Sequence, residues 1–429
     1  MYLNYHEEEL FKLLNNIIKE NGINTSIFVV GGWVRNKILN IPSNNDIDLV
    51  LDNITGKEFS KYFTTAKYIH EIKTNPDKSK NLETICIKIE IEDKIFDLDL
   101  CHFRKECYEK FNSRIPTIKK ANINEDALRR DFTINSLYYN INKKTVIDVT
   151  GFGLCHIKSK YISTPIDPSI TLFEDPLRGL RALRFHCQLN FNINTQIINV
   201  LSLKDYHDIL NNKVSKERIG MEIVKMLKTS NYKKGIILMN NINLTECIFN
   251  KNMLITNDII ELFNELDKKN LANLENILAL WLWDFYPQTK YILMDKLKLS
   301  KKISSKVDKL QKLGRNFQKF DDYTDIGICI QKSNDPYYKR KSIWIDSAII
   351  SNTYDKIYNC VEKQQLHNFW NMEPYFNGNE LQKEFNLQPG KIIKGLINEQ
   401  YCYRIKYPNC NIKEVTNHLK IYLENYYLL

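Results

Sequence analysis

Residues 27–51 read IFVVGGWVRNKILNIPSNNDIDLVL, and the rest of the chain is interpreted from this stretch. Four apolar residues, Ile27–Val30, favour a strand and lead into a Gly-Gly pair. A second apolar strand opens with Asp46 and Asp48. Because side chains on a strand alternate between its faces, both aspartates are expected on the same face. Two neighbouring carboxylates repel each other, so the pattern indicates a bound cation.

The spacing of these features fits a nucleoside triphosphate. Carboxylate oxygens suit Mg²⁺, which proteins commonly hold through one or two carboxylates together with substrate phosphates. A turn at Gly31 and Gly32 allows backbone N–H groups to approach a phosphate, and Arg35 follows one helical turn later to bind a phosphate oxygen. Taken alone, the glycines also fit a tight turn and the aspartates a solvated strand end. Their occurrence in one βαβ-sized unit favours a nucleotide site with Asp46 and Asp48 as metal ligands.

Composition bounds the class of protein. The chain has 429 residues, 43% of them hydrophobic, and a formal net charge of +10, which fits a globular protein of about two to four domains with a polyanionic partner. Ten cysteines occur without a CxxC pair, which argues against a zinc ribbon and favours a reducing compartment. The apolar runs are too short for a membrane span, and the acidic N-terminal helix predicted over 7–19 fits no targeting peptide. The expected location is therefore cytoplasmic or nuclear.

Two further strands are predicted, over 84–90 and 95–102, after a polar turn at 74–81. Asp97 and Asp99 share one face of the second strand, and an adjacent position in the sheet would bring Asp99 to the same metals. Alternatively, these acids line the solvent side of an edge strand.

The segments that follow are less regular at first. The polar, basic residues 105–124 show few signs of regular structure, as in a loop beside an active site. The pattern EDALRRDFTINSLYYNI then predicts a helix over 125–141. Arg129, Arg130 and Asp131 are consecutive, so they cannot share one face of it. An Asp and an Arg near a nucleotide can bond the ribose hydroxyls; a helix salt bridge is the alternative.

A second informative stretch spans 164–191, TPIDPSITLFEDPLRGLRALRFHCQLNF. Asp175 and Pro176 predict a helix start, with Asp as the N-cap and Pro at the first position. Arginines follow at intervals of three, which predicts a spiralling basic stripe; they are Arg178, Arg181 and Arg184.

Asp175 and Arg178 together offer a way to select bases. Cytosine and adenine both present an amino donor beside a ring-nitrogen acceptor, whereas uracil and guanine present a carbonyl beside an N–H. A carboxylate and a guanidinium would accept C and A and refuse U and G, because the wrong base leaves buried groups unpaired. The alternative is a capped surface helix with solvated arginines.

Five motifs in this order resemble those of class II tRNA nucleotidyltransferases, the CCA-adding enzymes, and look most like the eukaryotic branch. They are GGWVRN with DID, LDLCHFRKECY, EDALRRDFTIN, TPIDPSITLFEDPLRGLRALRF and VSKERIGMEIVKML, covering roughly residues 25–230 densely, with a weaker likeness in NGNELQKEFNLQPGKIIKGLI. The resemblance implies template-independent addition of C, C and A from CTP and ATP to the 3′ end of tRNA, with Mg²⁺. A poly(A)-adding, A-only or CC-only transferase and a catalytically silent tRNA-binding protein remain alternatives.

The resemblance also implies roles for individual residues. Asp46 and Asp48 would bind metals, with Asp99 as a third catalytic candidate. The nucleotide would be bound by the glycine turn, by Arg35, by a ribose-binding motif and by a base-selecting motif; these residues are Gly31, Gly32, Arg35, Arg129, Arg130, Asp131, Glu174, Asp175, Arg178, Arg181 and Arg184. Residues 105–124 correspond to the family's flexible loop.

Three positions depart from the family pattern. Asn36 stands where Asp is usual, and His156 and Ser163 stand where the hinge motif usually carries Asp and Arg. The metal and base-pairing positions are intact, so these departures do not indicate loss of activity.

The expected fold is α+β. A small mixed β-sheet head over 1–145 precedes a helical neck over 146–230 and a helical body and tail over 231–429. The Lys-rich helix predicted within 297–320 is the candidate for gripping the tRNA backbone, with a solvated amphipathic helix as the alternative. A monomer is expected.

Overall fold

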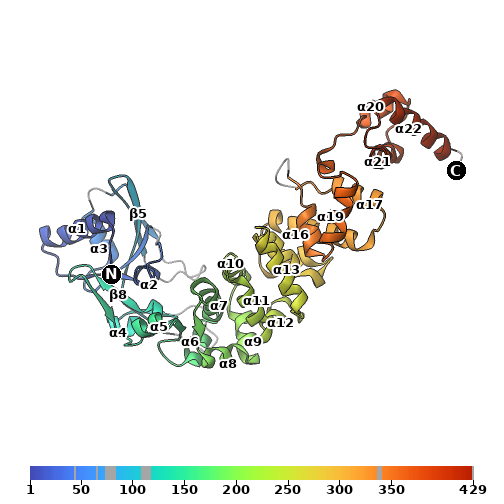
Figure 1. Ribbon diagram of the computed structural model, residues 1–429. Coiled ribbons are helices and arrows are strands. Elements are labelled where there is room, and N and C mark those ends of the chain that lie inside the picture. Colours follow the sequence, from blue (N-terminus) through green and yellow to red (C-terminus); the bar gives the residue numbers. More distant parts are fainter. Residues whose placement is uncertain (43–44, 64–65, 73–83, 108–116, 336–340, 428–429) are drawn as a thin grey trace. The chain divides into compact units, whose positions relative to one another are not determined.

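A computed structural model describes residues 1–42, 45–63, 66–72, 84–107, 117–335 and 341–427 (Figure 1). It contains two compact units, Met1–Asn252 and Met253–Leu429. The predicted turn at 74–81 and residues 108–116 of the predicted loop lie outside the described residues.

A seven-stranded mixed sheet forms the first part of the first unit, with strand order β3-β4-β5-β2-β1-β8-β9. Its strands are β1 (Ile27–Val30), β2 (Asp46–Leu51), β3 (Tyr68–Ile72), β4 (Thr84–Ile91), β5 (Lys94–His102), β8 (Leu137–Asn140) and β9 (Thr145–Asp148). Strands β2 and β5 run parallel, while the other neighbouring pairs run antiparallel. The four strands predicted up to residue 102 are thus confirmed within one residue.

One face of this sheet is covered along its centre. Alternate residues of β1 and β2, including Val29 and Leu49, are fully buried. Helix α1 (Tyr5–Glu20) packs on this side, where the rings of Phe11 and Tyr139 lie 5.9 Å apart. An Asn4 capping box starts the helix, so the predicted N-terminal helix is confirmed.

The opposite face is covered only in part. Phe28, Val50 and Tyr138 form a core cluster with Ala127 of α4 (Ile123–Leu128). This cluster covers β1, β8 and the end of β2, and the polar residues at the start of β2 remain exposed. The partial cover is what leaves room for a site on this face.

The helix predicted over 125–141 is confirmed only over residues 125–128 and is wrong beyond them. The chain leaves α4 after Leu128, makes a 3₁₀ turn at Thr133–Asn135, and enters β8. All four residues of β8 are buried and pair with β1 on one side and β9 on the other. Aromatic side chains favour a buried strand, and this sheet pairing outweighs the helical spacing.

Residues 105–124 contain more regular structure than expected. Strands β6 (Arg104–Cys107) and β7 (Thr117–Lys120) form an antiparallel two-stranded ribbon, and α4 begins within the same range.

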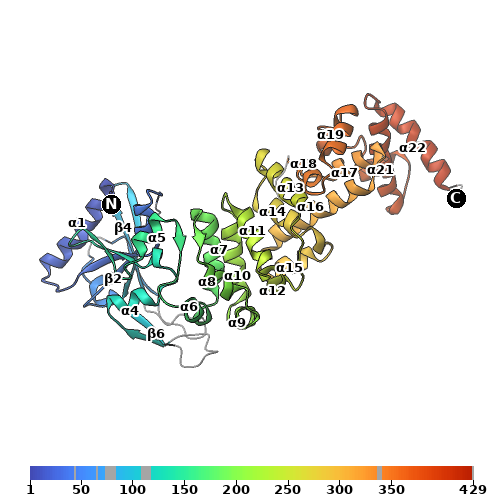
Figure 2. The same cartoon turned by 60° about the horizontal axis from the view of Figure 1, so that its bottom comes forward.

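Helices complete the first unit (Figure 2). They are α2 (Gly32–Ile38), α3 (Gly56–Ser60), α5 (Gly153–Lys158), α6 (Pro168–Glu174), α7 (Leu177–Leu189), α8 (Thr195–Leu201), α9 (Lys204–Lys213), α10 (Lys216–Leu227), α11 (Tyr232–Asn241) and α12 (Leu244–Phe249), with a parallel pair of short strands, β10 (Tyr161–Ile162) and β11 (Asn192–Ile193). Helix α7 contacts α10 and α11. At Gly179 a Cβ would lie 2.0 Å from the Tyr206 hydroxyl, so only glycine allows α9 to approach this closely.

The second unit is helical throughout its described residues. It contains α13 (Asn257–Lys268), α14 (Leu274–Trp281), α15 (Thr289–Lys296), α16 (Lys301–Lys319), α17 (Tyr323–Gln331), α18 (Trp344–Ile350), α19 (Tyr354–Lys363), α20 (Gly378–Glu384), α21 (Lys391–Lys406) and α22 (Ile412–Tyr427), with 3₁₀ turns at Trp283–Phe285 and Phe369–Asn371. Helix α16 packs against α14, α15 and α18. Among the described residues, no helix has the length and apolar character needed to cross a membrane.

The α+β prediction is therefore confirmed, with a mixed sheet followed by helices. The boundaries expected at residues 145 and 230 stay predictions; α11 and α12 belong to the first unit.

Candidate nucleotide and metal site

Three of the predicted carboxylates lie together on the uncovered face of the sheet. In the parallel pairing of β2 with β5, Asp48 stands opposite Asp99 and Asp46 opposite Asp97. Asp46, Asp48 and Asp99 are exposed, while the residues between them are buried. The sheet thus brings Asp99 beside the Asp46 and Asp48 pair, and β5 is an inner strand rather than an edge strand.

The pKa of Asp48 is raised above its ordinary value. Partial removal from water is the largest cause, the neighbouring carboxylates of Asp99 and Asp46 add to it, and Arg130 opposes it. A group whose charge is disfavoured in this way gains from a cation placed among the three acids. All the donors are hard carboxylate oxygens, which is the set that suits a divalent ion such as Mg²⁺.

A pocket of about 270 Å³ lies beside these acids. Its lining combines Asp48 and Asp99 with Arg104, Arg129 and Arg130. Negative and positive side chains thus border one cavity, an arrangement that fits a metal-bound phosphate chain.

The glycine turn borders the same place. Gly31 has a φ of 72°, and a Cβ there would lie 3.7 Å from Asp48 Oδ2 and 3.8 Å from Arg130 Nη1. Helix α2 begins at Gly32 directly after it. A positive φ favours glycine, so the predicted turn is confirmed and stands next to the acids.

Arg35 lies beneath this turn. Its side chain is buried, and a Cβ on Gly32 would lie 3.4 Å from Arg35 Nη2. The guanidinium donates to Asn36 Oδ1 at 2.8 Å and to Asn135 Oδ1, and it stacks over the Phe185 ring at 4.8 Å. Burial lowers the pKa of Arg35 to about 10. These contacts make Arg35 a support of the turn, and its role as a phosphate ligand stays a prediction.

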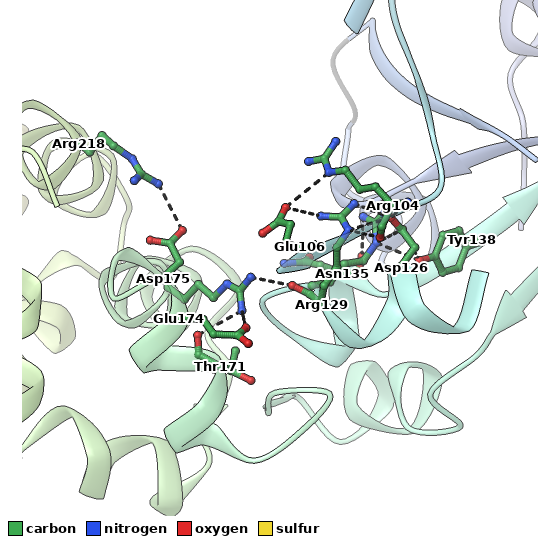
Figure 3. A network of polar contacts seen from close by, with 12 residues as sticks. Arg104, Glu106, Asp126, Arg129, Asn135, Tyr138, Thr171, Glu174, Asp175 and Arg218 are labelled. Carbon is green, nitrogen blue, oxygen red and sulfur yellow. Dashed lines mark hydrogen bonds and ion pairs between the residues drawn. The ribbon is translucent and has the colours of Figure 1, made fainter. Parts of the chain in front are cut away.

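Arg129 and Arg130 converge on one carboxylate that sequence reasoning missed, Asp126 of α4. Asp126 lies 2.5 Å from Arg129 Nη2 and 2.9 Å from Arg130 Nη2, and it accepts from the Tyr138 hydroxyl at 2.7 Å (Figure 3). The aspartate is fully buried, yet these partners lower its pKa to about 2 against the effect of burial. The helix salt bridge named as an alternative is thus present. The signal was available, because Asp126 precedes the two arginines by three and four residues.

Unlike Asp126, Asp131 contacts an arginine of helix α7. Its Oδ2 accepts from Arg181 at 2.6 and 2.8 Å, and the arginines hold its pKa at about 2 in spite of its burial. Arg184 donates to Glu222 Oε2 of α10 at 2.6 Å. Glu222 was not predicted, since no local spacing links it to a residue 38 positions earlier.

The predicted base-selecting residues lie at the junction of α6 and α7. The helix begins at Leu177, one residue later than expected, so the N-cap is Pro176 and the prediction of Asp175 as the N-cap is wrong. Asp175 Oδ1 still accepts from the Leu177 N–H at 3.2 Å. Arg178 is buried; it donates to the carbonyls of Thr171 at 3.2 Å and Arg129 at 2.7 Å, and it lies 3.7 Å from Glu174. Because Arg178 donates to the backbone carbonyl of Arg129, the two motifs meet in space.

The ribbon beside this junction adds residues that were not predicted. Glu106 of β6 lies 3.1 Å from Arg129 Nη1 and 3.5 Å from Arg104 Nε. Arg218 of α10 lies 3.3 Å from Asp175 Oδ2. Glu106 pairs with Arg104 on its own strand as well as with Arg129, whereas Arg218, which lies in the motif VSKERIGMEIVKML, pairs with Asp175 on another element. Local spacing does not indicate the contacts with Arg129 and Asp175.

The three departures from the family pattern have local partners. Asn36 accepts two hydrogen bonds from Arg35, so the amide keeps the acceptor while it removes the charge. His156 Nδ1 lies 2.8 Å from Thr133 Oγ1. The Ser163 hydroxyl accepts from Asn194 Nδ2 at 3.2 Å, and its backbone carbonyl accepts from the Thr133 N–H at 2.9 Å. Both positions are therefore built into the packing around Thr133.

The Lys-rich helix α16 is only partly available to a ligand. Lys306 pairs with buried Asp335 at 2.9 Å, and Lys309 donates to the Asn334 carbonyl. Val307, Leu310 and Phe317 are fully buried. Lys312 and Lys319 are exposed. The helix is therefore part of the core of its unit, with lysines at its edges.

A separate group of possible metal ligands lies on the surface. Among the described residues, His6, Glu92 and Asp93 have ligand atoms within 4.8 Å of one another. Glu92 and Asp93 are exposed, and none of the three belongs to the predicted site.

Comparison with known proteins gives a consistent result. Residues 27–163 match the family model described as the Poly A polymerase head domain. The chain is 28% identical to the tRNA nucleotidyltransferase cca1 of Schizosaccharomyces pombe, over 95% of this chain and 94% of that protein. It is 27% identical to the mitochondrial CCA tRNA nucleotidyltransferase of Candida glabrata, over 93% and 91%. Its fold is similar to that of the Thermotoga maritima CCA-adding enzyme complexed with tRNA, with a TM-score of 0.71, 18% identity, and coverage of 98% and 96%.

Proposed function

We propose that this chain, a tRNA nucleotidyltransferase of the poly(A) polymerase superfamily, adds C, C and A in turn from CTP and ATP to the 3′ end of tRNA, without a nucleic acid template. The observation that carries the proposal is the gathering of Asp46, Asp48 and Asp99 on the open face of β2 and β5, beside Gly31 and Arg130. The similarity to tRNA nucleotidyltransferases over nearly the whole chain supports it.

Asp46 and Asp48 would hold a divalent metal, which we propose is Mg²⁺, with Asp99 as a third ligand candidate. When bound, the metal would lower the pKa of the RNA 3′-hydroxyl and neutralise charge on the leaving pyrophosphate. The protein otherwise has to position the RNA 3′ end and the nucleotide. The hydroxyl oxygen forms a bond to the α-phosphorus while the bond to the pyrophosphate oxygen breaks, pyrophosphate leaves, and the hydroxyl proton passes to solvent.

The arginines around the acids have a charge-balancing role in this proposal. Arg130 faces the pocket beside Asp48, where it would contact phosphate or ribose oxygens. Asp126 holds Arg130 and Arg129 in place before a nucleotide arrives. Preorganised donors of this kind need no rearrangement at the moment of reaction.

Asp175 and Arg178 would read the incoming base. They lie three residues apart at the start of α7, and Asp131 supports Arg181 on the next turn of that helix. Hydrogen bonds to the amino group and ring nitrogen of C or A would select these bases, since a mismatched base leaves a buried donor or acceptor unpaired. Glu174 and Arg184 complete the set of residues proposed around the nucleotide.

The test is incorporation of each labelled NTP, singly and mixed, into a tRNA that ends before CCA, with Mg²⁺ and with EDTA. Two C and one A followed by a stop would support the proposal. A alone, C alone or a long A tail would move the function to a sister activity. No incorporation with Mg²⁺ would leave a protein that binds tRNA without chemistry. A monomer and a cytoplasmic or nuclear location remain predictions, to be tested by sedimentation and by microscopy.

A further inference from the structure

The carboxylate of Asp175 has a protein donor on each of its oxygens. Oδ1 accepts from the Leu177 N–H at 3.2 Å, and Oδ2 accepts from Arg218 Nη2 at 3.3 Å (Figure 3). The first donor belongs to the start of α7 and the second to the start of α10. A carboxylate held on both sides cannot rotate freely, so its remaining lone pairs point in fixed directions.

Arg218 is itself attached to a defined helix start. The Ser215 side chain caps α10 by accepting from the Arg218 N–H at 3.4 Å. The Arg218 side chain is 47% exposed and that of Asp175 is 27% exposed. An exposed pair of this kind contributes little to folding stability, so its effect is expected on orientation rather than on the fold.

The other half of the proposed base reader is held separately. Arg178 is fixed by the carbonyls of Thr171 and Arg129. A guanidinium has more N–H groups than these two carbonyls use, so donors remain for a base. Asp175 and Arg178 are thus each fixed by different neighbours: Arg178 by two carbonyls and the Glu174 carboxylate, and Asp175 by a backbone N–H and the exposed Arg218 side chain.

We propose that Arg218 is a positioning residue for base selection, which it serves by fixing the direction of the Asp175 carboxylate. This inference rests on the proposed function of Asp175. Without Arg218, the carboxylate keeps one anchor, turns about its Cβ–Cγ bond, and meets the amino group of C or A in fewer productive geometries. It also meets the wrong bases with a smaller penalty, because a movable acceptor is less often left unpaired.

The experiment compares Arg218→Gln and Arg218→Lys with the unchanged protein. Lys228→Gln is the matched control, since it removes the same charge from an exposed position at the end of α10. The readouts are kcat/KM for CTP against UTP on a tRNA that lacks its first C, the same ratio for ATP against GTP on a tRNA that ends in CC, and KM for tRNA. Thermal unfolding checks the fold of each variant.

We expect Arg218→Gln to lower both selectivity ratios about tenfold, the size expected for one hydrogen bond. Arg218→Lys should restore most of the selectivity, and Lys228→Gln should match the unchanged protein. Unchanged ratios in Arg218→Gln would overturn the inference, and so would a raised KM for tRNA without a change in either ratio, because Arg218 would then be a phosphate contact. If the unchanged protein failed to prefer C and A, the proposed function would fail first; if it prefers them and Arg218→Gln does too, only this inference fails.

Discussion

Two groups of carboxylates in the first unit have opposite surroundings. Asp46, Asp48 and Asp99 lie exposed on β2 and β5, and the pKa of Asp48 is raised. Asp126 and Asp131 are buried among arginines, and their pKa values are lowered to about 2. The carboxylates of β2 and β5 thus lack sufficient positive charge nearby, whereas Asp126 and Asp131 receive it from arginines of the chain.

The buried acids Asp126 and Asp131 stabilise the fold, whereas the exposed acids of β2 and β5 are proposed to bind a cation. A buried carboxylate between guanidiniums is stabilised by the protein itself, and removal of one partner leaves the other charge unpaired. Neighbouring carboxylates on an open face gain from a cation supplied from outside. Substitutions should therefore affect stability at Asp126 and Asp131, and chemistry at Asp46, Asp48 and Asp99.

The largest expected effect is on transfer. Asp48→Asn should lower kcat by roughly a thousandfold or more, because a metal site that stabilises developing charge contributes several kcal/mol to the transition state. Stability should stay equal or rise, since a repulsion is removed. Asp97→Asn is the control on the same face, where Asp97 pairs with Lys88 at 2.6 Å. Similar activity losses in both variants would contradict the distinction.

Next in size is the stability change from the buried acid. Asp126→Ala should lower the free energy of unfolding by about 3–5 kcal/mol, because two guanidiniums then lose their buried counter-ion. Glu125→Ala, on the same helix, removes only the Asn122 capping box and an ion pair with Lys105, and it should cost about 1 kcal/mol. Denaturant unfolding followed by circular dichroism measures both. Equal losses of unfolding free energy in the two variants would show that the burial of Asp126 among the arginines has no special role.

A smaller effect is expected on folding stability as the pH is lowered. The folded pKa of Asp131 is about 2, below its ordinary value of 3.8, so its contribution is present above the ordinary pKa and is lost as pH falls towards about 2. The loss should be roughly 2 kcal/mol. Asp131→Asn should be less stable at neutral pH and should lack this part of the decline when unfolding is compared at pH 5, 4 and 3. Parallel curves of stability against pH for Asp131→Asn and the unchanged protein would contradict the assignment of this loss to Asp131.

The smallest effect extends the comparison to α16 in the second unit. Lys312→Ala should weaken tRNA binding only a few fold and reduce the slope of log affinity against log salt by about 1, if exposed lysines contact phosphates. Lys306→Ala should instead lower thermal stability, because it leaves buried Asp335 without this partner, and it should not change the salt slope. Filter binding across a salt series separates the two outcomes.

Local sequence was sufficient where one element decides the outcome. The alternation of Asp46 and Asp48 predicted their common face, and the Gly-Gly pair predicted the turn at Gly31. Local sequence failed to predict the structure of segments whose conformation depends on a partner distant in the chain. Residues 137–140 form a strand because β1 and β9 pair with them on either side, which adds to the strand preference of their aromatic side chains.

The residues alone indicated the acids, the glycine turn, the arginine spacing, the order of the family motifs and, through their spacing, the pairing of Asp126 with Arg129 and Arg130. The charge contacts between distant segments depended on the folded arrangement. Asp99 reached Asp48 through the parallel pairing of β2 with β5, and Asp131 reached Arg181 across 50 residues. The reason is physical: periodicity fixes the direction in which a side chain points, but compensation of its charge depends on groups that folding brings within a few ångströms.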